Sequence, residues 1–328
     1  MGAVVLNDLR MCVDSRSYID ALHAILTHKR WISCSKPMLA GMTVTGFRFT
    51  VNRRLTAESA TAYNWMAENF LAADFIGVTA GQASGFQFDP VFPLYQKHAI
   101  SEIKASIDRG TGAVIWKDGF AVAVGYDDAA ESLYYCDGAE EGPKAMNYTG
   151  FGVNLSPYWY FQIIEDRVEM DEAAVYKESL VQAVYKWESH DPMLPESDYA
   201  CGREAYGAII EALRSGHYDP EGAYEVFRCY AAAKRDVASY TEALQKKGWT
   251  QLGETAGCYR EVAALFGKVL ATIEGNGDVV PLNDPDRTAK NLVPLFIDAR
   301  QAEEKAIQSV KTLLRETIDN RFHDIGLR

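Results

Sequence analysis

The chain has 328 residues, which at about 100–200 residues per domain corresponds to two domains with cores of ordinary size. Apolar residues make up 48% and charged residues 24%, a composition typical of globular proteins, so extensive disorder and fibrous repeats are excluded. Acidic residues exceed basic ones by 45 to 33, for a net charge of −12. This balance argues against a general role in nucleic-acid binding, because phosphate backbones need clustered Lys and Arg.

The first half of the chain predicts helices followed by an antiparallel sheet. Helices are expected at residues 14–27, 57–70 and 99–109. Runs of β-branched and aromatic residues predict strands at 113–117, 120–126, 132–136 and 158–164. The dipeptide Asp118-Gly119 between the first two runs is a strong hairpin signal. Helices first and an antiparallel sheet afterwards favour the α+β class over a parallel α/β fold.

The second half predicts an all-α helical bundle. Apolar residues recur at helical spacing over 224–244, 259–273 and 292–318, after a shorter helix near 202–214. Breakers separate these helices, the longest being 275–285, and Pro294 is expected in the first turn of the last helix. We place the boundary near Val168, which predicts a first domain at 1–168 and a helical domain at 169–328. A connecting helix at 171–187 and a linker at 189–197 would join them.

The six cysteines bear on compartment and cofactors. They are far apart, with no CxxC pair and no Cys/His cluster at zinc spacing, so we expect neither a structural zinc nor another cofactor. The first twelve residues lack the pattern of a secretory leader, and no apolar run approaches the roughly 18–20 residues that span a bilayer. These features predict a reduced, cytoplasmic protein that does not bind membranes.

Cys12 is the candidate nucleophile. It precedes the helix expected at 14–27, and a thiol at a helix N-terminus is favoured as thiolate by the helix dipole. Acyl-transfer chemistry through cysteine needs such a thiol, together with a base and a group that orients the base. The alternative is that Cys12 is a small buried apolar residue.

Several segments together resemble a known family. Met11-Cys12 before a helix, Met38-Leu39-Ala40-Gly41-Met42, and Gly46-Phe47-Arg48-Phe49 are similar to the N-terminal domain of the butirosin biosynthesis protein H type. The stretch from Ile103 through Gly125-Tyr126-Asp127 to Asp137 resembles the second half of papain-like C39-type peptidases. The resemblance implies a papain-like fold over the first 165 residues, acyl transfer or amide hydrolysis, and a place in bacterial secondary metabolism.

The family's functional residues transfer unevenly. The resemblance implies Cys12 as nucleophile, Asp137 as the residue that orients the histidine, and Asn7 near the place of an oxyanion-hole Gln. The family spacing puts the base histidine six residues before Gly125, where this chain has Gly119. His23 lies eleven residues after Cys12, about 16 Å along a continuous helix, so it is not expected to deprotonate the thiol.

Two hypotheses from different classes follow. In the first, Cys12 performs thiol-dependent acyl transfer or amide hydrolysis, with Asp137 retained and the base supplied by substrate, water or the helical domain. In the second, the protein is a non-catalytic pseudoenzyme whose cleft binds a peptide, a small metabolite or a partner protein. The implied partners are a peptide, an acyl carrier or a small-molecule substrate, and a second copy through the helical domain. An interaction protein built on the helical bundle is a third class.

Overall fold

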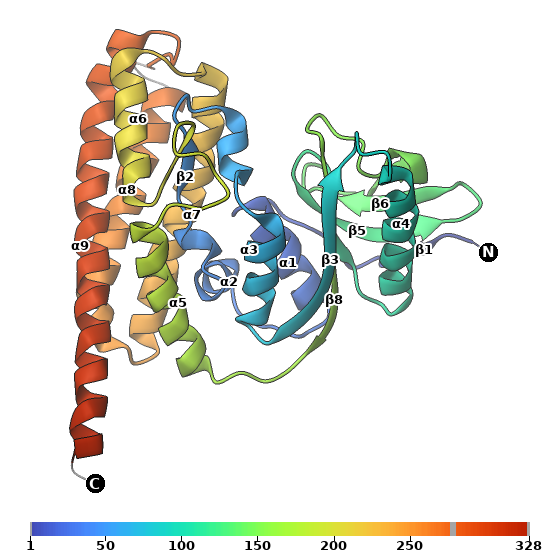
Figure 1. The fold of residues 1–328 in the computed structure, drawn as a ribbon, viewed down its shortest axis with the longest axis horizontal. Coiled ribbons are helices and arrows are strands. Elements are labelled where there is room, and N and C mark those ends of the chain that lie inside the picture. Colours follow the sequence, from blue (N-terminus) through green and yellow to red (C-terminus); the bar gives the residue numbers. More distant parts are fainter. Residues whose placement is uncertain (1, 276–279, 327–328) are drawn as a thin grey trace. The chain divides into compact units, whose positions relative to one another are not determined.

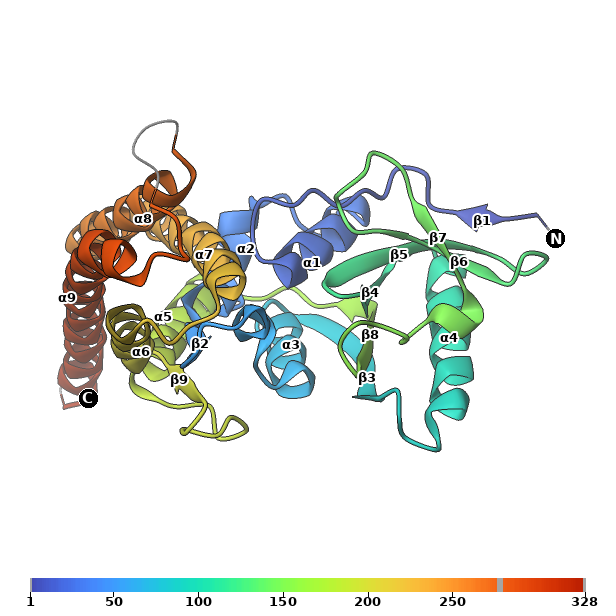
Figure 2. The same cartoon turned by 90° about the horizontal axis from the view of Figure 1, so that it is seen from above.

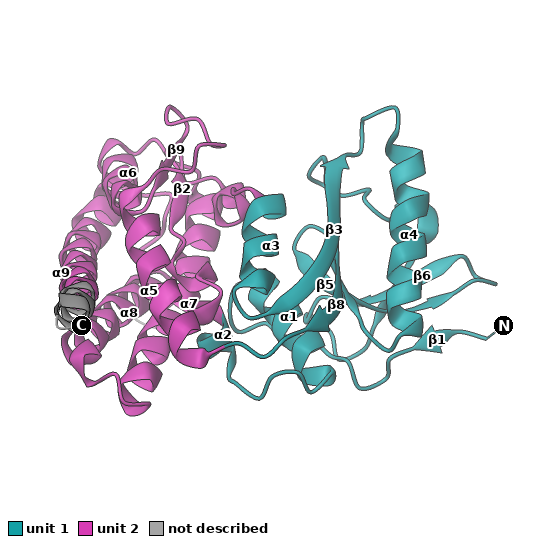
Figure 3. Cartoon of the chain, turned by 60° about the horizontal axis from the view of Figure 1, so that its bottom comes forward, with its two compact units in different colours: residues 1–39, 65–170 teal, residues 40–64, 171–328 magenta. Residues whose placement is uncertain are grey.

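The computed structural model describes residues 2–275 and 280–326, and side chains as far as Arg315. It is a mixed α+β structure with an antiparallel sheet and many helices, so the expected α+β class is confirmed (Figures 1 and 2). The chain divides into two compact units, coloured separately in Figure 3. Unit 1 comprises residues 1–39 and 65–170, and unit 2 comprises 40–64 and 171–328. The units separate after Met170, and 40–64, which the sequence pattern assigns to the first domain, belongs to the helical unit.

Unit 1 is built on a sheet in which every recorded strand pair is antiparallel. The strand order is β3-β8-β4-β5-β6-β7, and β1 pairs with β5. The strands are β1 (Val4–Val5), β3 (Val78–Phe86), β4 (Ala113–Trp116), β5 (Phe120–Asp127), β6 (Ser132–Cys136), β7 (Lys144–Asn147) and β8 (Tyr158–Arg167). The hairpin of β4 and β5 turns at Asp118-Gly119, as predicted.

Helices cover both faces of this sheet. Successive residues of a strand point to opposite faces of the sheet, so the side chains of Phe161 and Gln162 in β8 mark its two faces. Phe161 belongs to an apolar cluster with Ile103 of α4 (Phe92–Asp108). Gln162 accepts a hydrogen bond from the hydroxyl of Tyr18 of α1 (Ser17–His28) and donates one to a carbonyl of α3 (Trp65–Asp74). Helix α4 therefore covers one face, and α1 and α3 cover the other (Figure 2).

Unit 2 is a bundle of helices. They are α5 (Glu172–Glu188), α6 (Arg203–Ser215), α7 (Pro220–Lys246), α8 (Gly253–Glu274) and α9 (Pro285–Gly326), and α2 (Lys36–Met42) enters from unit 1. Helix α7 begins where Asp219 accepts a hydrogen bond from the Glu221 amide and Pro220 occupies the first turn. The bundle's core includes Phe49, whose ring lies 4.8 Å from that of Tyr206 and 4.6 Å from that of Tyr230.

A small sheet fastens residues 40–64 to the same unit. Strand β2 (Thr50–Asn52) pairs antiparallel with β9 (Tyr199–Cys201), and short 3-10 helices flank β2 at Thr45–Phe47 and Ala57–Thr61. The hydroxyl of Tyr230 accepts a 2.8 Å hydrogen bond from the Thr50 amide. Residues 40–64 therefore supply both core and strand pairing to the helical unit.

Several expected helix boundaries are wrong, among them the start of the helix expected at 99–109, which begins at Phe92. The helix expected at 14–27 begins only at Ser17, because Arg16 is extended. The helix expected at 57–70 is interrupted at Ala62, which is also extended, and becomes a 3-10 turn followed by α3. Helix α9 starts at Pro285, where Asp284 accepts a hydrogen bond from the Arg287 amide, so Pro294 lies inside this helix. Part of the expected breaker at 275–285 lies outside the described residues.

Candidate functional site

The segment before α1 folds back along the helix. The backbone amides of Asp14 and Ser15 donate to the Asp20 carboxylate, at 3.4 and 3.2 Å, instead of continuing the helix. The ammonium of Lys36 donates to the carbonyl of Cys12 and to Asp14, both at 2.5 Å. Cys12 is therefore exposed, five residues before the first helical residue. The expectation that Cys12 stands at a helix N-terminus is wrong, and so is the alternative that it is buried.

Asp20 is the electrostatic centre of this fold-back. Its side chain has no solvent exposure, and Lys36 lies 2.9 Å from it. Burial raises the pKa of Asp20 to about 6, although the hydrogen bond and charge of Lys36 oppose the shift. Burial alone would lower the pKa of Lys36, but its bonds to Asp14 and Asp20 outweigh this and raise the pKa. The three charges thus hold one another in place.

The fold-back creates a cavity of about 650 Å3 within unit 1. Charged and titratable side chains dominate its walls, which are formed by Asp8, Arg10, Cys12, Asp14, Asp20, His23, Ala24, Thr27, His28, Arg30 and Lys36. Cys12 and His23 thus line the same cavity. The separation of about 16 Å assumed one continuous helix, and the helix begins too late for that assumption to hold.

His23 is held in one tautomer. Its Nε2 lies 3.0 Å from the Cys34 carbonyl oxygen, which can only accept, so Nε2 carries the proton. Burial lowers the pKa of His23, which favours the neutral ring. Nδ1, 3.5 Å from the Thr27 hydroxyl, is then the ring atom able to accept a proton.

Gly119, where the resemblance implies the base, lies next to a residue that contacts Ser17 at the start of α1. Gly119 lies in the β4–β5 turn, and a Cβ built there would meet no atom within 4 Å. The next amide, of Phe120, donates to the Ser17 hydroxyl at 3.4 Å. Ser17 is the first residue of α1, so the residue at the helix N-terminus beside Gly119 is Ser17 and not Cys12. Sequence analysis missed Ser17, although the apolar stripe of Tyr18, Leu22 and Ile25 begins directly after it.

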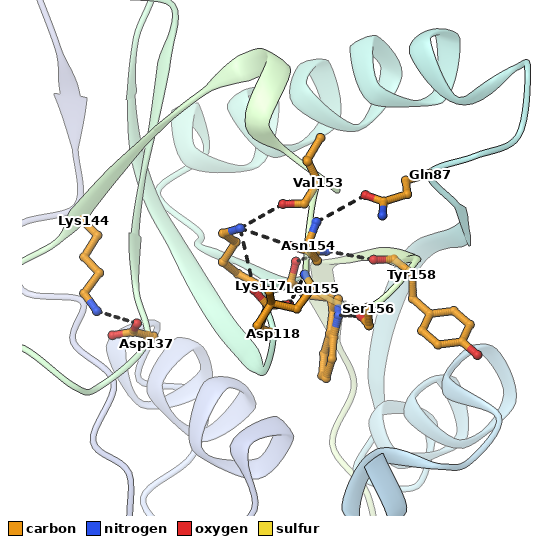
Figure 4. Close-up of polar contacts among 11 residues, drawn as sticks. Gln87, Lys117, Asp118, Asp137, Lys144, Val153, Asn154, Leu155, Ser156 and Tyr158 are labelled. Atoms are coloured by element: carbon orange, nitrogen blue, oxygen red, sulfur yellow. Dashed lines mark hydrogen bonds and ion pairs between the residues drawn. The ribbon is translucent and has the colours of Figure 1, made fainter. Parts of the chain in front are cut away.

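Asp137 and Asn7 are engaged elsewhere or exposed. The Asp137 carboxylate accepts from Lys144 at 2.8 Å (Figure 4) and from the Ala139 amide at 3.1 Å. Burial would raise the pKa of Asp137, but these bonds outweigh it and lower the pKa. The adjacent Gly138 packs against the backbone of 11–13. Asn7 is exposed in the turn closed by the Leu9 amide on the Leu6 carbonyl, and the neighbouring Asp8 lines the cavity.

A loop at 153–157 is fixed against the turn that carries Gly119. The Asn154 amide group donates to the carbonyls of Tyr158 and Trp116, at 2.8 and 3.4 Å. The Leu155 backbone amide donates to Asp118 at 2.7 Å, and Lys117 donates to the Val153 carbonyl at 2.9 Å (Figure 4). The Leu155 side chain is nevertheless 96% exposed. A rigid loop thus presents an apolar side chain beside Gly119.

An aromatic strip leads from the surface to the same place. Its members are Phe88, Phe86, Tyr158, Trp65, Trp116 and Phe120, in that order. The successive ring centroids are 5.0, 5.4, 5.5, 4.5 and 5.1 Å apart. Phe88 is 69% exposed and Phe120 is 2% exposed, so the strip runs from solvent into the core directly after Gly119.

Comparisons and searches add no assignment. No protein-family model matches the chain, and no curated protein matches it either. Among the described residues there is no group of three or more His, Cys, Asp or Glu side chains arranged to hold a metal ion. Over the same residues no helix is both long and apolar enough to cross a bilayer.

Proposed function

We propose that this protein is a non-catalytic relative of the papain-like C39-type peptidases it resembles, and that it binds a peptide without cleaving it. The proposal is carried by the arrangement at the start of α1, where the Ser17 hydroxyl accepts the Phe120 amide beside a bare Gly119. The resemblance implies a histidine at the position of Gly119, and the nucleophile that it implies, Cys12, lies five residues before this helix. Loss of the base from such a triad typically lowers the rate by factors of thousands.

The aromatic strip and Leu155 support binding at this edge of the sheet. Stacked aromatic rings offer large rigid apolar area at little cost in conformational entropy. The loop that carries Leu155 is already ordered by hydrogen bonds from Asn154, Lys117 and the Leu155 amide. A peptide with apolar side chains would bury the exposed rings of Phe88 and Tyr158, which are 69% and 43% exposed.

The test compares hydrolysis by the wild type and by a double variant, Ser17→Cys with Gly119→His. The wild type should not hydrolyse fluorogenic peptides or acyl thioesters above the buffer rate. The double variant should gain measurable thiol-dependent hydrolysis, because position 119 has room for a side chain. Wild-type turnover that disappears in Cys12→Ser would refute the proposal.

Peptide binding itself is measured with a fluorescent library of apolar heptapeptides. We expect binding to quench the indole fluorescence of Trp65 and Trp116, which lie 4.5 Å apart in the strip. Leu155→Asp should abolish this binding while leaving the melting temperature unchanged, because the side chain is 96% exposed. Val13→Asp, at another exposed apolar residue of unit 1, is the matched control.

Thiol-dependent acyl transfer through Cys12 is the second candidate. It is favoured by one observation: the exposed thiol shares its cavity with His23, whose Nδ1 is able to accept a proton. An amine substrate that serves as its own base would also tolerate the absence of a triad histidine. Under this hypothesis the Cys12 thiol attacks an acyl thioester, such as an acylated carrier, and releases the carrier as a free thiol. The acyl group left on Cys12 is detected by intact-mass spectrometry and is absent in Cys12→Ser. Iodoacetamide labelling of Cys12 no faster than a free thiol at pH 7 would count against it.

A further inference from the structure

The cavity beside α1 contains two kinds of charged groups. Asp14, Asp20 and Lys36 satisfy one another and the backbone of 12–15. These three side chains are held in place by one another. The Lys36 ammonium has no further donor for a ligand, because it already contacts three oxygens. The three side chains therefore shape the cavity, and binding capacity must come from the other walls.

The remaining walls offer both signs of charge. Within the described parts of the chain, neither the Arg30 guanidinium nor the Asp8 carboxylate has a recorded side-chain hydrogen bond or ion pair, and both residues are exposed at the cavity. One guanidinium nitrogen of Arg10 donates to the Glu141 carbonyl at 2.9 Å, and its other N–H groups remain available to a ligand. Nδ1 of His28 is buried and has no hydrogen-bond partner among the described residues. His28 is also one of the residues that line the cavity.

Arg30 occupies a backbone position that glycine normally fills. Its φ is +57°, in the left-handed region. The Arg30 amide bonds to the Thr27 carbonyl and the Trp31 amide to the Leu26 carbonyl, the Schellman pattern that ends α1. A side chain in this conformation is strained, so the chain retains a guanidinium at this wall against the local preference for Gly.

From these observations we propose that the cavity is a binding site for a small zwitterion, such as a free amino acid or a short peptide with free ends. Arg10 and Arg30 take the carboxylate, because guanidinium forks match its geometry. Asp8 takes the ammonium group. The groups left to bind a ligand are two guanidinium groups and one carboxylate, so the walls can hold both ends of a zwitterion. The site is separate from the binding surface at Gly119 and does not depend on it.

The test is calorimetric titration of the full chain with L-alanyl-L-alanine and with L-glutamine. We expect saturable binding of at least one of them. The N-acetyl form, which lacks the ammonium group, and the C-terminal amide, which lacks the carboxylate, should each bind at least about tenfold more weakly. Capped forms that bind as well as the free zwitterion, or no saturable binding of either zwitterion, would overturn the proposal.

Arg30→Gly separates binding from folding. Glycine relieves the left-handed backbone, so the melting temperature should stay equal or rise, by roughly 2 °C, while affinity for the zwitterion falls at least about tenfold. Glu131→Gly is the matched control, because Glu131 also has a positive φ, of +47°, and lies outside the cavity. It should share the gain in stability and keep full affinity. Equal affinity of Arg30→Gly and the wild type would contradict the assignment.

Discussion

Asp20 is the residue whose protonation should be most visible in stability. Its pKa is about 6 in the folded chain, against 3.8 for an unperturbed carboxyl. The folded state therefore binds this proton more tightly than the unfolded chain. The resulting stabilisation is complete below about pH 3.8 and is lost as the pH rises through about 6, a change on the order of 3 kcal/mol.

Urea unfolding of the wild type and of Asp20→Asn between pH 4 and 7 measures this effect. The difference in free energy of unfolding between wild type and variant should fall as the pH rises from 4 to 6 and then level off, because only the wild type loses a proton there. A difference that is flat over this range, or an NMR titration of the Asp20 carboxyl with a midpoint near 4, would contradict the prediction.

Gly41 is fixed by the packing of one ring. A Cβ at this position would lie 2.1 Å from Cγ of Tyr240, whose hydroxyl is bonded to Ser179 at 2.6 Å. The Tyr240 ring is buried, and its hydroxyl is fixed by Ser179, so the ring cannot move away from an added methyl group. Gly41→Ala should therefore destabilise the protein by about 1–3 kcal/mol or more. Gly207→Ala in α6 is the control, because nothing lies within 4 Å there. It should stabilise by about 0.5–1 kcal/mol. Thermal unfolding of both variants tests the prediction, and equal effects would refute it.

At the residue scale, the sequence places Gly119 in the turn between two strands, but it does not predict how the segment around Cys12 folds. The turn at Gly119 could be located from the strand pattern, because the two flanking runs of β-formers pair as a hairpin. Cys12 could not be placed, because the bonds of the Asp14 and Ser15 amides to Asp20 depend on a side chain whose orientation no local pattern reveals. Because these two amides bond to a side chain, α1 does not extend toward residue 14 and begins at Ser17.

At the scale of elements, a buried ion pair joins three helices of unit 2. Lys234 of α7 donates to Glu303 of α9 at 2.7 Å, and their side chains are 1% and 3% exposed. The Tyr206 hydroxyl of α6 donates to the other carboxylate oxygen at 2.6 Å. The ammonium lies 4.3 Å from the centre of the Phe49 ring. These contacts set the register of α6, α7 and α9 around Phe49.

Removing one partner of this pair should be far worse than neutralising both. Lys234→Met leaves the Glu303 carboxylate buried without its cation, and we expect a loss of about 3–5 kcal/mol in free energy of unfolding. Adding Glu303→Gln removes the unpaired charge and keeps an acceptor for Tyr206, so the double variant should recover more than half of the loss. Urea denaturation of the two variants measures this recovery. A double variant as unstable as Lys234→Met would show that the charge is not the cause.

Elements with a strong local pattern were predicted well, and elements made by their neighbours were not. The hairpin of β4 and β5 follows from its β-branched residues and Asp118-Gly119. Strand β3 was missed, because its central residues are small and have little strand propensity. It forms through its pairing with β8 along nine residue positions. The small sheet of β2 and β9 was missed for a similar reason, since its two strands are far apart in sequence.

For the whole molecule, the assignment of 40–64 to unit 2 predicts how fragments behave. A fragment of residues 169–328 would lack Phe49, Val51 and Leu55, which all belong to the bundle's core. It would also leave β9 without its partner. We therefore expect this fragment to keep helix by circular dichroism but to melt without cooperativity, because its core has a large void.

Adding a peptide of residues 40–64 should restore a cooperative transition. A peptide of the same composition with Phe49→Ala should restore it poorly, since that ring lies between Tyr206 and Tyr230. A fragment that melts cooperatively by itself would show that 40–64 is dispensable.

Light scattering on the intact chain, run alongside, measures the self-association predicted for the helical half.

The placement of 40–64 also has a consequence for the order of events at the ribosome. The chain passes between the units three times, and residues 40–64 are synthesised more than a hundred residues before any other part of unit 2. At roughly 5–20 residues per second, Phe49 and Val51 wait on the order of ten seconds for the helices that bury them. Over that interval the nascent chain carries apolar residues whose packing partners in unit 2 have not yet been synthesised.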